Sequence, residues 1–169
     1  MIRLILLFLI STSSAFAESV VIGMDKEKVA ITATFDGSQI LLFGAVKRDK
    51  PAPIGDLQVI VTVAGPSERI SVHRKSKVLG IWMNTETVEV DAAPSFYAVA
   101  TSSDFLSTIS DTEDLRYKVS IPRAIRSVGA PMNVLDAVSF SEAVIRIRKE
   151  QGLYKLLENT VEIDEQNLF

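Results

Sequence analysis

The sequence has 169 residues, of which 47% are hydrophobic and 23% are charged, with a formal net charge of −3. This composition is ordinary for a folded domain and argues against an intrinsically disordered chain. The mild acidity argues against nucleic acid as a partner, because domains that bind nucleic acid carry an excess of positive charge. The absence of cysteine excludes thiol catalysis and cysteine-ligated metals.

The first 17 residues have the three parts of a cleavable secretory signal peptide. Arg3 is the positive n-region, residues 4–10 are an apolar run, and Ala15 and Ala17 form a small-x-small cleavage site. The apolar run is shorter than the roughly 20 residues that a membrane-spanning helix needs. We therefore expect residues 1–17 to be removed, and residues 18–169 to form one exported, periplasmic β-rich domain.

Period-2 alternation of apolar residues predicts a series of short strands separated by turn signals. They span residues 29–35, 40–46, 57–64, 70–74, 78–83, 85–90, 96–101, 153–157 and 160–163. The first two are expected to form a hairpin with the second more fully buried, and the third and fourth to pair across a turn at 65–68. This spacing is typical of an antiparallel sandwich, so the predicted fold is mainly β and resembles an immunoglobulin-like module.

Helical signals begin only after residue 101. Polar residues there are expected to cap a short helix near 103–109. One further helix is predicted over 139–151, where Ser139 and Glu142 fit a capping box and Gly152 provides the stop signal.

The segment 111–138 shows no helical or strand period. Its acidic residues Asp111, Glu113 and Asp114 lack the spacing of a calcium-binding loop, so we interpret them as a surface loop.

A basic run and the single tryptophan form the candidate binding site: His73, Arg74, Lys75, Lys77 and Trp82. One interpretation makes them a contact for a small anion, acidic lipid head groups or a protein partner. The alternative makes the run a solvated strand end or hairpin tip, and Trp82 a core residue with a hydrogen-bonded N–H. Tyr97 is likewise expected in the core with a partner for its hydroxyl.

The sequence contains no grouping that specifies a reaction. A single histidine excludes the common multi-histidine metal sites, and no Gly-x-Ser-x-Gly motif accompanies it. The glycines form neither a dinucleotide-binding nor a phosphate-binding loop. We therefore predict no catalytic residue, no metal site and no cofactor.

Six stretches match a known family in the same order along the chain. They are residues 34–45 (TFDGSQILLFGA), 63–66 (VAGP), 74–75 (RK), 80–84 (GIWMN), 94–98 (PSFYA) and 148–154 (RKEQGLY). On these residues the chain resembles the Alph_Pro_TM family of transmembrane proteins of the Alphaproteobacteria, over essentially the whole segment that follows the signal peptide.

The resemblance implies a signal peptide, a periplasmic β-rich domain and one C-terminal membrane helix, and it also implies a permease of the sulfite-exporter kind as a neighbour. It carries no catalytic residue to this chain. After residue 17, no apolar run reaches the roughly 18 residues of a membrane helix. We therefore expect this chain to be truncated before the helix that would anchor the full-length protein.

Three functional hypotheses remain. The leading one is a non-enzymatic periplasmic interaction module, membrane-anchored at full length, with an integral membrane protein such as a transporter as its partner. The second is a small-anion-binding domain that uses Arg74, Lys75 and Lys77 near Trp82. The third is an enzyme of unknown class, which would need a cleft with two converging carboxylates, or a perturbed Tyr97 or His73.

Overall fold

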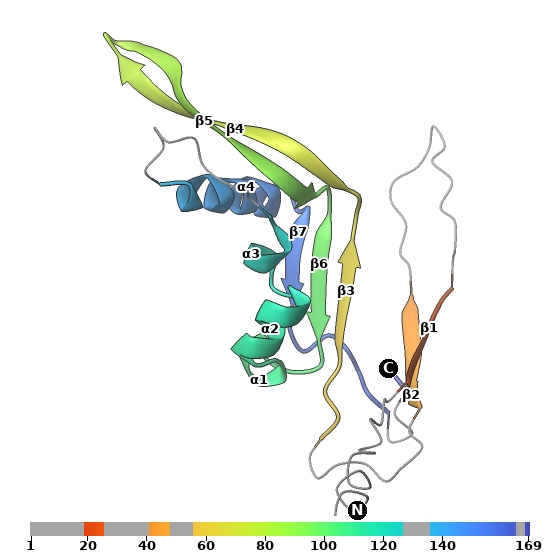
Figure 1. Cartoon of the computed structure of the whole chain (residues 1–169). Coiled ribbons are helices and arrows are strands. Elements are labelled where there is room, and N and C mark those ends of the chain that lie inside the picture. The colour runs from red at the N-terminus through yellow and green to blue at the C-terminus, as the bar shows by residue number, and fades with distance from the viewer. Residues whose placement is uncertain (1–18, 26–40, 48–55, 127–135, 165–167) are drawn as a thin grey trace, which may run out of the picture. The chain divides into compact units, whose positions relative to one another are not determined.

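The computed structural model describes residues 19–25, 41–47, 56–126, 136–164 and 168–169 (Figure 1). The chain divides into two compact units. Unit 1 comprises Met1–Asp56 and Asp164–Phe169, and unit 2 comprises Leu57–Ile163. The predicted signal peptide and the predicted strand at 29–35 lie outside the described residues.

Unit 1 contains a two-stranded antiparallel sheet of β1 (Ser19–Met24) and β2 (Leu42–Lys47). The chain end lies beside β2, where Gly44 and Phe169 exchange two backbone hydrogen bonds of 2.6 and 2.9 Å. β2 confirms the predicted strand at 40–46 but is less buried than its unbroken apolar run predicted. Phe43 is 50% exposed because a sheet of two strands covers little of its own surface.

Unit 2 contains a three-stranded sheet in the order β3–β6–β7. β3 (Ile60–Ala64) runs antiparallel to β6 (Tyr97–Thr101), and β6 runs parallel to β7 (Tyr154–Leu157). The odd-numbered residues of β6 are buried and the even-numbered ones are half-buried. Alternate side chains of a strand point to opposite faces, so one face of this sheet is covered.

A long antiparallel hairpin of β4 (Ser67–Val78) and β5 (Ile81–Pro94) projects from the sheet of unit 2 (Figure 1). It turns at Leu79 and Gly80, whose φ angles are 50° and 88°. Positive φ at both central residues is the geometry of the favoured two-residue hairpin turns, because its twist matches that of the strands.

This hairpin corrects the predicted pairing. Residues 70–74 pair with β5 and not with 57–64, and residues 67–68 belong to a strand and not to a turn. The strand predicted at 78–83 is divided by a tight turn: Val78 ends β4, and residues 81–83 begin β5, which also contains the strand predicted at 85–90. The apolar run around Leu79 hid that turn, because turns are usually polar.

The residues described between β6 and β7 form four helices: α1 (Phe105–Thr108), α2 (Asp111–Tyr117), α3 (Ile121–Ala124) and α4 (Val138–Glu150). The first and last confirm the helices predicted near 103–109 and 139–151. The acidic segment predicted as a surface loop is helix α2, and Asp114 within it is buried. Its hydrogen-bonded cap at Ser110 is a local signal that the irregular spacing of apolar residues obscured.

Two further predictions are wrong in detail. The capping box of α4 does not form, and the backbone N–H of Ser139 instead donates to Asp136 Oδ1 over 3.2 Å. Residues 160–163 form no strand. The N–H groups of Thr160 and Val161 both donate to the carbonyl of Thr101, over 2.9 and 3.2 Å. Two donors on one carbonyl do not make the repeating hydrogen bonds of a strand pair.

The core of unit 2 lies between its sheet, the base of the hairpin and the helices. Its buried members are Val90, Ala93, Tyr97, Val99, Ile121, Ile125, Val144 and Tyr154. Val88 and Phe140 form a second cluster with half-buried Val72, which joins the hairpin to α4. Because burying such a side chain contributes roughly 1.5–3 kcal/mol, these contacts hold the hairpin base in place.

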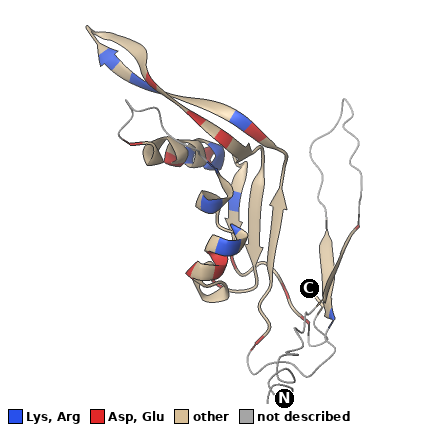
Figure 2. Cartoon of the chain, in the orientation of Figure 1, with Lys and Arg blue, Asp and Glu red and all other residues tan. Residues whose placement is uncertain are grey.

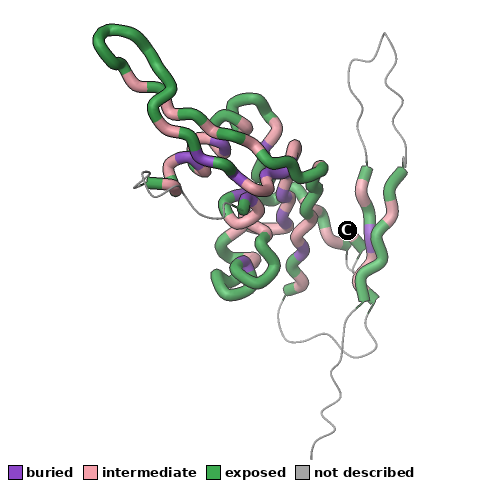
Figure 3. Tube along the Cα trace, turned by 45° about the horizontal axis from the view of Figure 1, so that its top comes forward, coloured by how far each residue is buried: buried purple, intermediate pink, exposed green. Residues whose placement is uncertain are grey.

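The fold is mainly β with antiparallel pairing, as predicted, but an immunoglobulin-like sandwich is not confirmed. The sheet of unit 2 includes the parallel pair β6–β7. The buried residues gather where the helices face the strands (Figures 1 and 3). The described core of unit 2 is therefore packed sheet against helix.

Candidate functional site

The residues predicted as a binding site all lie on the hairpin. Four are on β4 and one is on β5: His73, Arg74, Lys75, Lys77 and Trp82. The register places Lys77 opposite Trp82 and Lys75 opposite Asn84. Directly opposed residues of an antiparallel pair share a face, so Lys75, Lys77 and Trp82 project to the same side.

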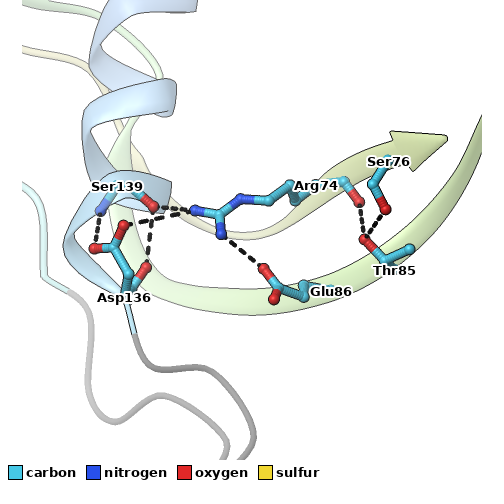
Figure 4. Close-up of polar contacts among 6 residues, drawn as sticks. All are labelled: Arg74, Ser76, Thr85, Glu86, Asp136 and Ser139. Carbon is cyan, nitrogen blue, oxygen red and sulfur yellow. Dashed lines mark hydrogen bonds and ion pairs between the residues drawn. The ribbon is translucent and has the colours of Figure 1, made fainter.

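Arg74 does not share the surroundings of its basic neighbours. Its Nη1 donates to Glu86 Oε2 over 2.8 Å, and its Nη2 hydrogen-bonds to Ser139 Oγ (Figure 4). Asp136 Oδ2 lies 3.8 Å from the same guanidinium, whose carbon is 4.5 Å from the ring centroid of Phe140. Arg74 therefore joins the hairpin to the start of α4, and its donors are used within the fold.

The β-bulge next to Arg74 separates two parts of the hairpin. Arg74 pairs with Glu86 but Lys75 pairs with Asn84, which leaves Thr85 as the extra residue. The Thr85 hydroxyl accepts from Ser76 Oγ at 3.0 Å and donates to the Arg74 carbonyl at 3.4 Å (Figure 4). A bulge interrupts the ladder and increases the local twist, so the outer hairpin is set off from its packed base.

Residues 75–84, which we call the hairpin tip, are mostly exposed to solvent (Figure 3). They include five large apolar side chains. The exposed fractions are 41% for Val78, 99% for Leu79, 67% for Ile81, 67% for Trp82 and 51% for Met83. The interpretation of Trp82 as a core residue is therefore wrong. Sequence reasoning missed Leu79 and Ile81, although Gly80 between them was the available turn signal.

The hairpin tip carries positive charge and no acidic residue. Lys75 and Lys77 are its charged side chains, and neither forms an ion pair within the described part of the chain. The outer end of the hairpin is accordingly blue and tan in Figure 2. His73, just before the bulge, lies with its Nδ1 2.9 Å from Thr87 Oγ1 across the strand pair.

A second basic feature lies away from the hairpin tip, at α2 and α3. Lys118, Arg123 and Arg126 line a cavity of about 250 Å³ together with Leu115 and Ile125. The sequence predicted no site here, because these cations are spread over nine positions without a recognisable motif.

One of these three cations already has a partner. Arg123 Nε donates to Asp114 Oδ2 over 2.7 Å, and the Ser120 N–H donates to the other carboxylate oxygen over 2.7 Å. Burial raises the pKa of Asp114, but these hydrogen bonds and the nearby guanidinium outweigh it and leave that pKa lowered. The carboxylate thus stays charged and ties α2 to α3.

The two buried tyrosines serve the core. The Tyr97 hydroxyl donates to the Val119 carbonyl over 2.9 Å, which confirms the expected partner, and the Tyr154 hydroxyl donates to the Pro94 carbonyl over 2.8 Å. Burial and the nearby charge of Asp114 raise the pKa of Tyr97. Burial also raises the pKa of Tyr154. Both phenols therefore remain protonated donors.

The described residues contain neither a metal-binding cluster nor a membrane-spanning helix. No three His, Asp or Glu side chains gather as they do around a metal ion. None of the described helices is long and apolar enough to span a bilayer.

Comparison with known proteins identifies a family. No curated protein and no solved structure shows a significant match to the chain. One family model, with the description "Putative transmembrane protein", matches residues 19–169, which include the whole hairpin. The chain therefore belongs to the Alph_Pro_TM family.

Proposed function

We propose that this chain is a non-enzymatic, exported module that makes contact at a membrane through its β4–β5 hairpin, in the periplasm and beside an integral membrane protein such as a transporter. Membership of a family described as transmembrane supports the membrane setting. The observation that carries the proposal is the hairpin tip, where apolar side chains and two lysines are exposed together.

Exposure of this kind is costly for a domain that acts alone in water. Single exposed apolar residues are ordinary, but a contiguous group of them marks an interaction site. Here five such side chains lie within six positions, 78–83, around one turn. Tryptophan and leucine buried in a contact contribute several kilocalories per mole, so the hairpin tip has the chemistry of a contact element.

Photo-crosslinking tests this proposal. An unnatural photoreactive residue at position 79 should capture a membrane component in cells, because that side chain is 99% exposed at the turn. The same residue at position 106 on α1, where Leu106 is 85% exposed, is the matched control and should not capture that component. Equal capture from both positions would contradict a role for the hairpin.

The exported location is tested separately. If residues 1–17 are a signal peptide, cleavage after Ala17 leaves Glu18 as the first residue of the mature protein. N-terminal sequencing of protein recovered from the periplasmic fraction should read Glu18-Ser19-Val20. A chain that keeps Met1 and stays with the cytoplasmic fraction would exclude export.

The cavity beside α3 favours a second candidate function, the binding of a small anion. Lys118 and Arg126 face this cavity together with Arg123, which is paired with Asp114. Calorimetry with sulfate, sulfite and phosphate should detect binding that Lys118→Ala/Arg126→Ala abolishes. The control is Lys75→Ala/Lys77→Ala, which should bind normally. Loss of binding in the control alone would instead locate the anion at the hairpin tip.

A further inference from the structure

The apolar side chains of the hairpin tip surround the turn and do not form a single face. The register at the tip pairs Lys75 with Asn84, Ser76 with Met83, Lys77 with Trp82 and Val78 with Ile81. Neighbours along a strand point to opposite faces. Trp82 therefore lies on one face of the ribbon and Ile81 on the other, with Leu79 at the turn between them.

This distribution distinguishes two kinds of partner. A groove on a folded protein would cover one face of the ribbon and leave the other in water, whereas the headgroup layer of a bilayer closes around both faces. We infer that the hairpin tip inserts into the interfacial layer of an anionic lipid bilayer. The inference rests on the proposed function, in which the hairpin is the contact element, and it names lipid as its partner.

The dimensions of the turn fit shallow insertion. A strand rises about 3.3 Å per residue, so Trp82 lies roughly 7–10 Å behind the end of the hairpin. Interfacial apolar segments penetrate about 5–10 Å, which places Trp82 at the level of the head groups, where tryptophan is enriched. Deeper insertion is opposed because a two-stranded ribbon has unpaired backbone groups along both edges.

The charges of the hairpin tip select the kind of lipid. Lys75 and Lys77 share the face of Trp82: Lys77 lies directly opposite Trp82, and Lys75 lies two residues farther from the turn. Both would lie among the lipid phosphates. Arg74 is engaged by Glu86 and Ser139, so it marks the inner limit of this basic surface. A lysine near an anionic surface strengthens binding about fivefold. We therefore expect a preference for anionic over zwitterionic lipid.

Trp82 provides a local probe, because it is the single tryptophan of the chain. The full chain is titrated with vesicles of phosphatidylcholine alone, and with vesicles that also contain phosphatidylglycerol. With the anionic vesicles, the Trp82 emission should shift to the blue, and lipids brominated near the head group should quench it. Every variant keeps residues 1–17, so binding by that segment is common to all of them, and the Trp82 emission and its quenching report on the hairpin tip.

Three variants define the expected result. Leu79→Ser/Ile81→Ser keeps the tryptophan but should weaken vesicle binding at least tenfold, since two apolar side chains are lost. Lys75→Ala/Lys77→Ala should weaken binding to anionic vesicles about 25-fold and leave binding to neutral ones unchanged. Leu106→Ser, the matched exposed change on α1, should behave like the parent.

An emission that neither shifts nor is quenched with either vesicle overturns the inference. If position 79 nevertheless captures a protein in cells, the proposed function stands and the partner is a protein. If position 79 captures nothing and Trp82 does not respond to vesicles, the proposed function and the inference both fail.

Discussion

Arg74 and Lys75 are adjacent basic residues on β4 with different surroundings. Arg74 contacts Glu86, Ser139 and the ring of Phe140, and it is 41% exposed as a side chain. Lys75 lies beyond the bulge and makes no ion pair with a described residue. The planar guanidinium reaches several acceptors and stacks on a ring at once, which an ammonium group cannot do.

Replacing Arg74 should destabilise the fold, whereas replacing Lys75 should not. We expect Arg74→Ala to lower the free energy of unfolding by about 1–2 kcal/mol, because Glu86 loses its partner and solvent screens part of the loss. Arg74→Lys should recover less than half. Urea denaturation of both Arg74 variants and of Lys75→Ala checks this. If Arg74→Ala and Lys75→Ala lower the free energy of unfolding equally, Arg74 does not stabilise the contact between the hairpin and α4.

Asp114 should make the stability of unit 2 depend on pH. Its folded-state pKa is lowered below the unfolded value of about 3.9, so its stabilising effect is present above that pH. The effect is lost as the pH falls through the folded pKa. Asp114→Asn should lower the free energy of unfolding by about 1–3 kcal/mol at neutral pH. It should also make the free energy of unfolding depend less on pH in the acidic range.

The matched control for this pH effect is Asp111→Asn, on the exposed side of the same helix. It removes a carboxylate from the same helix without breaking the contact between Asp114 and Arg123, so it should cost far less stability than Asp114→Asn. If the free energy of unfolding falls equally with pH for Asp114→Asn and the parent, the Asp114–Arg123 pair is not the source of the pH dependence.

At the scale of elements, the turn of the hairpin contains a residue that is unfavourable for its backbone conformation but exposed for contact. Leu79 takes a left-handed conformation, which is unfavourable for a leucine, and it buries almost nothing in return. Natural sequences usually place Asn-Gly in such turns. A residue that costs stability and stays exposed is consistent with a contact role.

We therefore expect Leu79→Asn to stabilise the hairpin while weakening its contact. Asparagine tolerates the left-handed region, so the gain in unfolding free energy should be about 0.5–1 kcal/mol. Thermal unfolding and hydrogen exchange of the β4–β5 amides measure the gain. Destabilisation by Leu79→Asn would show that Leu79 packs against something in the native protein.

At the scale of the whole molecule, the chain forms two compact units, and most of the described core lies in unit 2. The eight buried residues of its main cluster come from strands on both sides of the helical segment and from the helical segment itself, so this core is assembled within Leu57–Ile163. The candidate surfaces, at the hairpin tip and beside α3, also belong to unit 2.

Unit 2 should therefore fold when produced by itself. A chain of residues 57–163 is expected to unfold cooperatively, with Tyr97 and Tyr154 in an ordered environment, because the contacts that bury them are internal to the unit. Near-ultraviolet circular dichroism during urea denaturation checks this. A gradual, non-cooperative loss of signal would show that the core requires unit 1.

The sequence by itself determined the mainly β character, the helix near 139–151, the family and the location of the candidate residues on one segment. These features depend on local periods, on stop signals such as Gly152 and on short motifs. Only the tertiary structure decided that β5 pairs with β4, that Trp82 is exposed and that Arg74 is engaged while Lys75 is not. Those outcomes depend on contacts between distant residues, such as Arg74 with Ser139, 65 positions apart, which no local pattern encodes.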